Sequence, residues 1–197
     1  MHVDPLPLGA YPWYLRPWLW WRRRRRGTLP EGTRVWARLP RLYLATGLLQ
    51  RVLERRRGAV EPALRALAGL RVAQLTESVW GVDHYGRVLR DEGAAWEKIR
   101  KVGQWPETEC FGSRERAVLA YAEAMTDSAT PVSADIMGSV KRHLDDEALI
   151  ELTGVIAYQN MTARFHHALD IPPQGLCSVG VDERGEAVAV DEGPAAR

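Results

Sequence analysis

Apolar side chains recur with the period of an α-helix through most of this 197-residue chain, and glycines and prolines divide the pattern into short segments. The clearest segment begins at Pro62, after which Leu64, Leu67 and Leu70 follow at intervals of three residues. A helix brings residues three and four apart to one face, so this spacing predicts a helix from Pro62 to about residue 76. The repeated pattern constrains the chain to an all-α fold.

The other segments extend the same interpretation. Two helical pieces are expected within residues 33–57, separated at Pro40, and Ser113 is expected to cap the helix that follows it. Further helices are expected at about 80–92, 95–102, 113–126, 133–144 and 146–169. Residues 105–112 are expected to form a loop, and short Val-rich runs around Arg184-Gly185 predict a hairpin before a disordered end.

Three parts of the chain follow from this division. Residues 1–58 are expected to form an N-terminal arm and amphipathic helices, residues 59–177 the main helical domain, and residues 178–197 a tail. Five prolines within the first thirty residues are expected to forbid a long helix there and to favour an extended arm.

Charge is distributed very unevenly. Residues 1–60 contain thirteen arginines and no lysine against three acidic residues, whereas the rest of the chain is acidic. From Trp13 to Arg26 the arginines adjoin several tryptophans, which suits an arm on a neighbouring subunit or contact with a membrane surface. Nucleic acid is the least favoured partner because no base-reading motif accompanies the arginines.

Only two cysteines occur, Cys110 and Cys177, without partners at metal-ligand spacing. They predict neither a disulfide framework nor a metal site, and a reducing cytoplasm is the simplest location. No cofactor motif is present. The apolar run at residues 13–21 is shorter than the roughly 20 residues that a membrane-spanning helix needs, so attachment to a membrane would be peripheral.

Several sequence strings carry a family resemblance. RVAQL, Val82-Asp83, ERAVLAYAEAMT, DDEALIELTGVIAYQNMTARFHHAL and DIPPQGLC occur in an order that resembles the carboxymuconolactone decarboxylase family, which includes the peroxiredoxin-like alkylhydroperoxidase D. The likeness covers residues 62–177 and continues more loosely upstream. It implies an alkylhydroperoxidase D-like helical bundle that assembles as a homo-oligomer, a trimer or hexamer.

The peroxidase relay of that family is replaced in this chain. The family's glutamate, its two cysteines in C-x-x-C and its histidine correspond to Ala66, Ser78, Gly81 and Tyr85. A serine hydroxyl is not ionised near neutral pH and cannot form a sulfenic acid, so it cannot replace the thiolate. The resemblance therefore implies a family member whose thiol peroxidase activity is lost, unless Cys177 or Cys110 has taken over the redox chemistry.

Two other functions stay open from the residues alone. Acid/base chemistry on a small organic acid needs no cysteine, and Asp83, His84 and Tyr85 are its candidate catalytic residues. The pocket would be completed by Ser78, Trp80, Gly81 and Arg164, with a small molecule as ligand. The alternative is a non-catalytic binding protein or one associated with a membrane surface.

Overall fold

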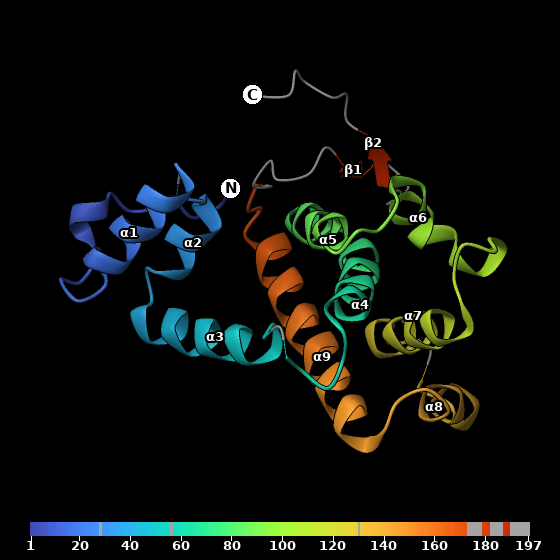
Figure 1. The fold of residues 1–197 in the computed structure, drawn as a ribbon. Coiled ribbons are helices and arrows are strands. Elements are labelled where there is room, and N and C mark those ends of the chain that lie inside the picture. The colour runs from blue at the N-terminus through green and yellow to red at the C-terminus, as the bar shows by residue number, and fades with distance from the viewer. Residues whose placement is uncertain (28, 56, 130, 173–178, 182–186, 190–197) are drawn as a thin grey trace.

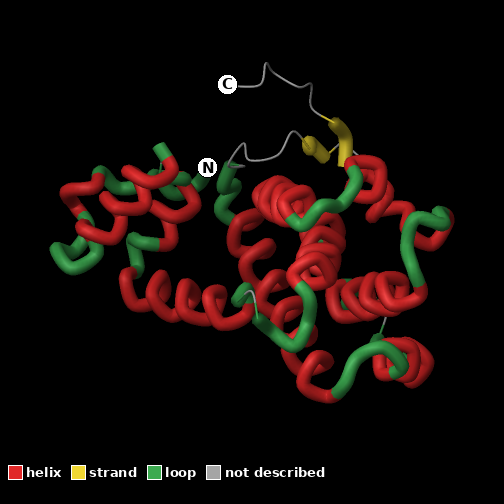
Figure 2. The backbone as a smooth tube through the Cα atoms, viewed as in Figure 1, coloured by secondary structure: helices red, strands yellow, loops and turns green. Residues whose placement is uncertain are grey.

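The computed structural model describes residues 1–27, 29–55, 57–129, 131–172, 179–181 and 187–189. The main bundle consists of α4 (Pro62–Leu75), α5 (Val79–Asp91), α6 (Trp96–Arg100), the 3-10 helix η2 (Lys101–Glu107), α7 (Ser113–Thr126), α8 (Ala134–Lys141) and α9 (Asp146–Ala168). Before it come η1 (Leu8–Ala10), α1 (Arg16–Arg26), α2 (Glu31–Trp36) and α3 (Pro40–Leu53). The predicted helical fold class is confirmed (Figures 1 and 2).

The helix boundaries follow local chemistry. Pro40 and Pro62 are the first residues of α3 and α4, where the missing N–H of proline costs no hydrogen bond. Asp145 caps α9, because its carboxylate accepts a hydrogen bond of 2.8 Å from the N–H of Ala148. The long last helix and the break at Pro40 thus lie where the sequence predicts them.

Two local predictions were wrong. The N-terminal segment is not an extended arm, because α1 runs for 11 residues with Pro17 in its first turn, the one place where a helix tolerates proline. Ser113 does not cap α7. Gly112 precedes that helix, and its N–H donates to the Glu115 carboxylate at 3.0 Å.

Helix α8 and the segment before α7 also differ in detail from the prediction. Helix α8 ends at Lys141, three residues earlier than expected, and Trp105 and Pro106 lie in η2 instead of a loop. Strands β1 (Val179–Val181) and β2 (Ala187–Ala189) pair antiparallel, with Val179 opposite Ala189. The turn between them, Cys177 and the chain end lie outside the described residues.

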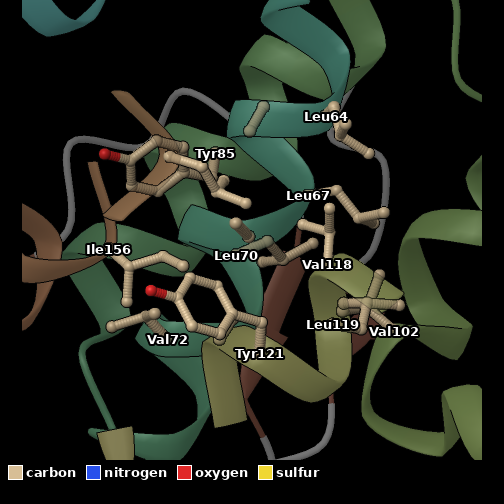
Figure 3. Close-up of a cluster of buried hydrophobic side chains, with 14 of the residues drawn as sticks. Leu64, Leu67, Leu70, Val72, Tyr85, Val102, Val118, Leu119, Tyr121 and Ile156 are labelled. Carbon is tan, nitrogen blue, oxygen red and sulfur yellow. The ribbon is translucent and has the colours of Figure 1, made fainter. Parts of the chain in front are cut away.

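Helix α4 lies at the centre of the main core. It is apolar on nearly all sides, and it packs against α5, α7 and α9. Figure 3 shows Leu67 and Leu70 of α4 beside Val118 of α7, while Ile156 of α9 lies on the other side of the cluster, near Val72. Burial of each such side chain contributes roughly 1.5–3 kcal/mol.

The N-terminal helices have a small core of their own. Tyr11, Leu15 and Leu19 are buried against Tyr43 of α3, and the Tyr11 hydroxyl donates a hydrogen bond of 2.7 Å to the Arg34 carbonyl. We call residues 1–53 the N-terminal unit. Figure 1 shows it beside α9, on the side away from α7.

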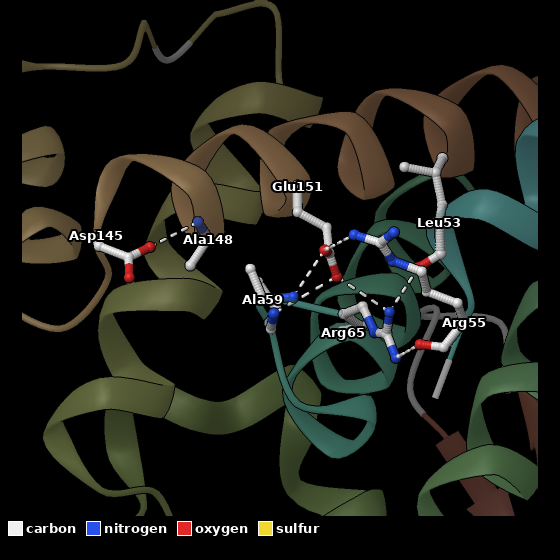
Figure 4. Close-up of polar contacts among 8 residues, drawn as sticks. Leu53, Arg55, Ala59, Arg65, Asp145, Ala148 and Glu151 are labelled. Atoms are coloured by element: carbon white, nitrogen blue, oxygen red, sulfur yellow. Dashed lines mark hydrogen bonds and ion pairs between the residues drawn. The ribbon is translucent and has the colours of Figure 1, made fainter. Parts of the chain in front are cut away.

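A buried ion pair fixes α3 to the bundle. Glu151 of α9 lies 3.0 Å from Arg65 of α4 and also accepts the N–H of Ala59 at 2.8 Å (Figure 4). The Arg65 guanidinium in turn donates to the carbonyls of Leu53 and Arg55, at 2.7 and 2.6 Å. The residue between them, Glu54, is thereby held at a defined place beside the bundle.

Among the described helices, none combines the length and the apolar character that crossing a membrane requires.

Candidate functional site

A cleft of about 850 Å³ separates the N-terminal unit from the bundle. Helices α1, α2 and α3 line one side of it, and α5 and α9 line the other. Its Trp and Tyr side chains are Tyr14, Trp18, Trp21, Trp36, Tyr43, Trp80, Tyr85 and Tyr158. We call it the aromatic cleft. It suits a small, flat and mainly apolar molecule, because aromatic walls favour stacking on such a ring.

A histidine and a carboxylate meet in this cleft. His84 Nε2 of α5 lies 3.7 Å from Glu54 Oε1, and both residues line the cavity. The His84 ring stacks on Trp80, with ring centroids 5.1 Å apart and planes inclined by 13°. The indole fixes the imidazole plane, so His84 presents a defined edge to Glu54.

Two phenols lie near this pair. Burial, followed by the negative charge of Glu54, raises the pKa of Tyr85 well above its usual 10.0. The same two causes raise the pKa of Tyr158. Tyr85 can lie this deep because its ring packs on Gly69 of α4, where an added Cβ would come within 2.6 Å of the ring. Both phenols therefore keep their protons and can act as hydrogen-bond donors.

A second histidine lies deeper. His166 of α9 is 4 % exposed, and its Nε2 accepts a hydrogen bond of 3.0 Å from the indole N–H of Trp36. Burial and then the neighbouring His84 lower the pKa of His166 from 6.5 to about 4. The ring is neutral near pH 7, with its proton on Nδ1, and that atom has no hydrogen-bond partner among the described residues.

Ser78 and Gly81, the two positions that correspond to the family's cysteines, do not line the cleft. Ser78 is 2 % exposed, and its Oγ accepts the N–H of Gly81 at 3.2 Å as the N-cap of α5. A Cβ on Gly81 would come within 2.7 Å of the Ala73 Cβ and 2.8 Å of Gln159 Nε2. Since any side chain at position 81 meets these atoms, the site has no room for a second thiol in this packing.

Asp83 and Arg164 are not brought to the cleft. Asp83 is 1 % exposed and points to the buried side of α5, as expected for a helix neighbour of His84, about 100° away around the axis. Arg164 donates to Asn160 Oδ1 and to the Thr126 carbonyl. Of the predicted site residues, the structure brings together Trp80, His84 and Tyr85.

Cys110 does not take part in the candidate site, and the described residues form no metal site. Cys110 is partly buried against the main core and does not line the aromatic cleft. Within the described part of the chain, no three side chains of the types His, Cys, Asp and Glu gather as a metal site would require.

Sequence reasoning missed Glu54, Tyr158 and the role of His166. Glu54 follows the end of α3 and belongs to no motif. On α9, however, Tyr158, Thr162 and His166 recur at intervals of four and all face the cleft. This stripe is visible in the sequence and could have indicated the pocket wall.

Comparisons with other proteins agree with this fold. The family profile described as the carboxymuconolactone decarboxylase family matches residues 42–124. The uncharacterized protein YnjA of Escherichia coli K12 is 34% identical over 173 residues, covering 88% of this chain and 95% of YnjA.

Solved structures share the fold at lower identity. A cysteine-to-alanine variant of the debrominase Bmp8, in complex with 2,3,4-tribromopyrrole, superposes with a TM-score of 0.75 at 20% identity, covering 89% of this chain and 93% of Bmp8. The alkylhydroperoxidase AhpD core of a peroxidase-related protein from Ralstonia eutropha JMP134 gives 0.78 at 16%, covering 88% and 92%. The chain belongs to the carboxymuconolactone decarboxylase family and has an alkylhydroperoxidase D-like fold.

Proposed function

We propose that this chain is a family member without thiol peroxidase activity that binds a small, flat organic molecule in the aromatic cleft and transfers a proton with His84. The observation that carries the proposal is the pairing of His84 with Glu54, 3.7 Å apart, in a cavity lined by aromatic rings. The carboxylate partner is Glu54 of the cleft and not Asp83, which lies on the buried side of α5.

Loss of the peroxidase chemistry is supported by the two relay positions. Ser78 Oγ is engaged as a helix cap, and position 81 is filled by Ala73 and Gln159. A peroxide cleaved by one thiolate needs a second thiol to resolve the sulfenic acid. Neither sulfur is present, and Cys110 lies away from the cleft.

Acid/base chemistry is supported by the polar groups that remain. His84 removes a proton from carbon or oxygen of the bound molecule, and the electron pair of the broken bond stays on that molecule. The new positive charge on the imidazole then lies beside the Glu54 carboxylate. Tyr85, still protonated, donates a hydrogen bond to an oxygen on which negative charge develops. The flat ring bound by Bmp8 is of a size that such a cleft accepts.

A probe reaction tests the base directly. In 5-nitrobenzisoxazole, a general base removes the C3 proton, the ring N–O bond breaks, and coloured 2-cyano-4-nitrophenolate forms. We expect the protein to accelerate this elimination, and the double variant Cys110→Ser/Cys177→Ser to do so equally. His84→Ala should lower the rate by about 100-fold, the usual scale of one general base. Hydroperoxide reduction with a dithiol reductant should not exceed the reductant alone.

Matched controls separate the cleft from the protein surface. His143→Ala removes a histidine outside the cleft and should leave the elimination rate unchanged. Glu54→Gln should lower the rate while leaving the fold intact, because Glu54 is partly exposed. A rate that survives in His84→Ala, or one that disappears with the cysteines, would overturn the proposal.

A further inference from the structure

Helix α1 has three faces with different surroundings. Leu15 and Leu19 enter the small core of the N-terminal unit, and Trp18 and Trp21 line the aromatic cleft. The third face lies about 100° around the axis from Leu19 and carries Trp20, which is 56% exposed. Leu19 faces the core while Trp20, Arg23 and Arg24 are exposed, so this third face points outward.

Aromatic side chains stand out from this surface. Trp13 is 78% exposed and Trp20 is 56% exposed. Exposing a single indole on a soluble surface is unfavourable, and several together indicate a surface that meets an apolar or interfacial partner. We call Trp13, which lies just before the helix, and Trp20, with the arginines described next, the outer face of α1.

The same face is strongly basic. Arg16, Arg23 and Arg24 are exposed, and no acidic residue occurs between Pro5 and Pro30. Among the described residues, no carboxylate forms an ion pair with these three guanidinium groups. Their charge is therefore available to a partner, and the partner must be anionic.

We propose that the outer face of α1 docks on the surface of an anionic phospholipid bilayer. Indoles favour the headgroup region, where the ring is apolar and its N–H meets water, and arginines pair with lipid phosphates. The helix lies along the bilayer, with Trp13 and Trp20 inserted to headgroup depth and the guanidinium groups on phosphates.

The geometry favours lipid over nucleic acid. Nucleic-acid bases stack on open ring faces, but one face of Trp20 is covered by the Arg24 guanidinium, 5.4 Å from the ring centroid. The cleft-lining rings Trp18 and Trp21 stack on each other, with centroids 5.1 Å apart. The outer face therefore offers guanidinium charge beside an indole that already has a cation over one face, which suits a headgroup layer better than a stack of bases.

Vesicle binding of the full-length protein tests the proposal. We expect the protein to sediment with vesicles of phosphatidylcholine mixed with phosphatidylglycerol, and not with phosphatidylcholine alone. Arg23→Glu/Arg24→Glu should weaken binding by at least about tenfold, given the usual contribution of each basic residue. Brominated lipid should quench tryptophan fluorescence, and Trp13→Ser/Trp20→Ser should lose most of that quenching.

A charge-matched variant provides the control. Arg87→Glu/Arg90→Glu makes the same charge change on α5, outside the outer face of α1, and should bind vesicles as the unmodified protein does. Equal loss in this control would overturn the proposal, since net charge alone would then explain binding. Tight binding to a single-stranded oligonucleotide without binding to anionic vesicles would also overturn it. Both charge-reversed variants should remain folded by circular dichroism. Arg87 pairs with Asp91 at 2.9 Å and Arg90 lies 4.4 Å from the Trp96 ring centroid, so the control variant is expected to unfold at a somewhat lower temperature.

Discussion

At the scale of single residues, Gly81 shows how packing excludes the chemistry of the family's relay. Gly81→Ala places a Cβ within 2.7 Å of Ala73, and we expect it to lower the free energy of unfolding by about 1–3 kcal/mol, the usual cost of overpacking. Urea denaturation measures this change. Gly138→Ala on α8 is the matched control, because a Cβ there meets nothing within 4 Å and alanine gains about 0.5–1 kcal/mol over glycine inside a helix. An unaffected Gly81→Ala variant would show that a cysteine could be restored at this position.

At the scale of elements, α2 docks on α9 through a pair that depends on pH. Trp36 stacks on Phe165 with centroids 3.7 Å apart and donates to His166 Nε2. Because the folded pKa of His166 is about 4 against 6.5 for a free histidine, the unfolded chain binds the extra proton first. The contribution of His166 to the free energy of unfolding is therefore fully present above about pH 6.5. It falls by about 3 kcal/mol in total as the pH drops towards 4. Urea denaturation across this range should show a shallower pH dependence for His166→Gln than for the unmodified protein. His143→Gln is the control and should show the pH dependence of the unmodified protein. If the free energy of unfolding of His166→Gln changes with pH as steeply as that of the unmodified protein, the pKa assigned to His166 is contradicted.

At the scale of the whole molecule, an exposed apolar stripe on α3 predicts that copies of the chain associate with one another. Leu42, Ala45, Leu49 and Val52 lie at helical intervals of three and four and are all exposed, although they form one apolar stripe. A second copy of the chain would cover this stripe, in keeping with the expected homo-oligomer. Light scattering after size exclusion should give at least twice the 22.2 kDa chain mass. Leu49→Asp/Val52→Asp should give the mass of one chain, whereas Ile150→Asp, at a position 72% exposed on α9, should not change the assembly. A single-chain mass for the unmodified protein would contradict this prediction.

The sequence by itself determined most of the helical framework. Pro40 and Pro62 mark the first residues of α3 and α4, and Asp145 caps α9, because these signals act over one helical turn. The sequence also shows directly that Ser78 and Gly81 stand where the family's relay has cysteines. Prediction from neighbouring residues failed where several weak local signals competed. Five prolines indicated an extended arm, yet α1 forms because Leu15 and Leu19 gain burial in a core that the arm itself completes.

Only the tertiary structure decided which polar groups share a cavity. The sequence places Asp83 and His84 side by side, and helix geometry requires them to face different directions, but it does not say which one meets a ligand. That depends on the docking of the N-terminal unit, which brings Glu54 within 3.7 Å of His84 and leaves Asp83 buried. Capping and periodicity are set by residues one turn apart, whereas the aromatic cleft depends on packing between helices far apart in the chain.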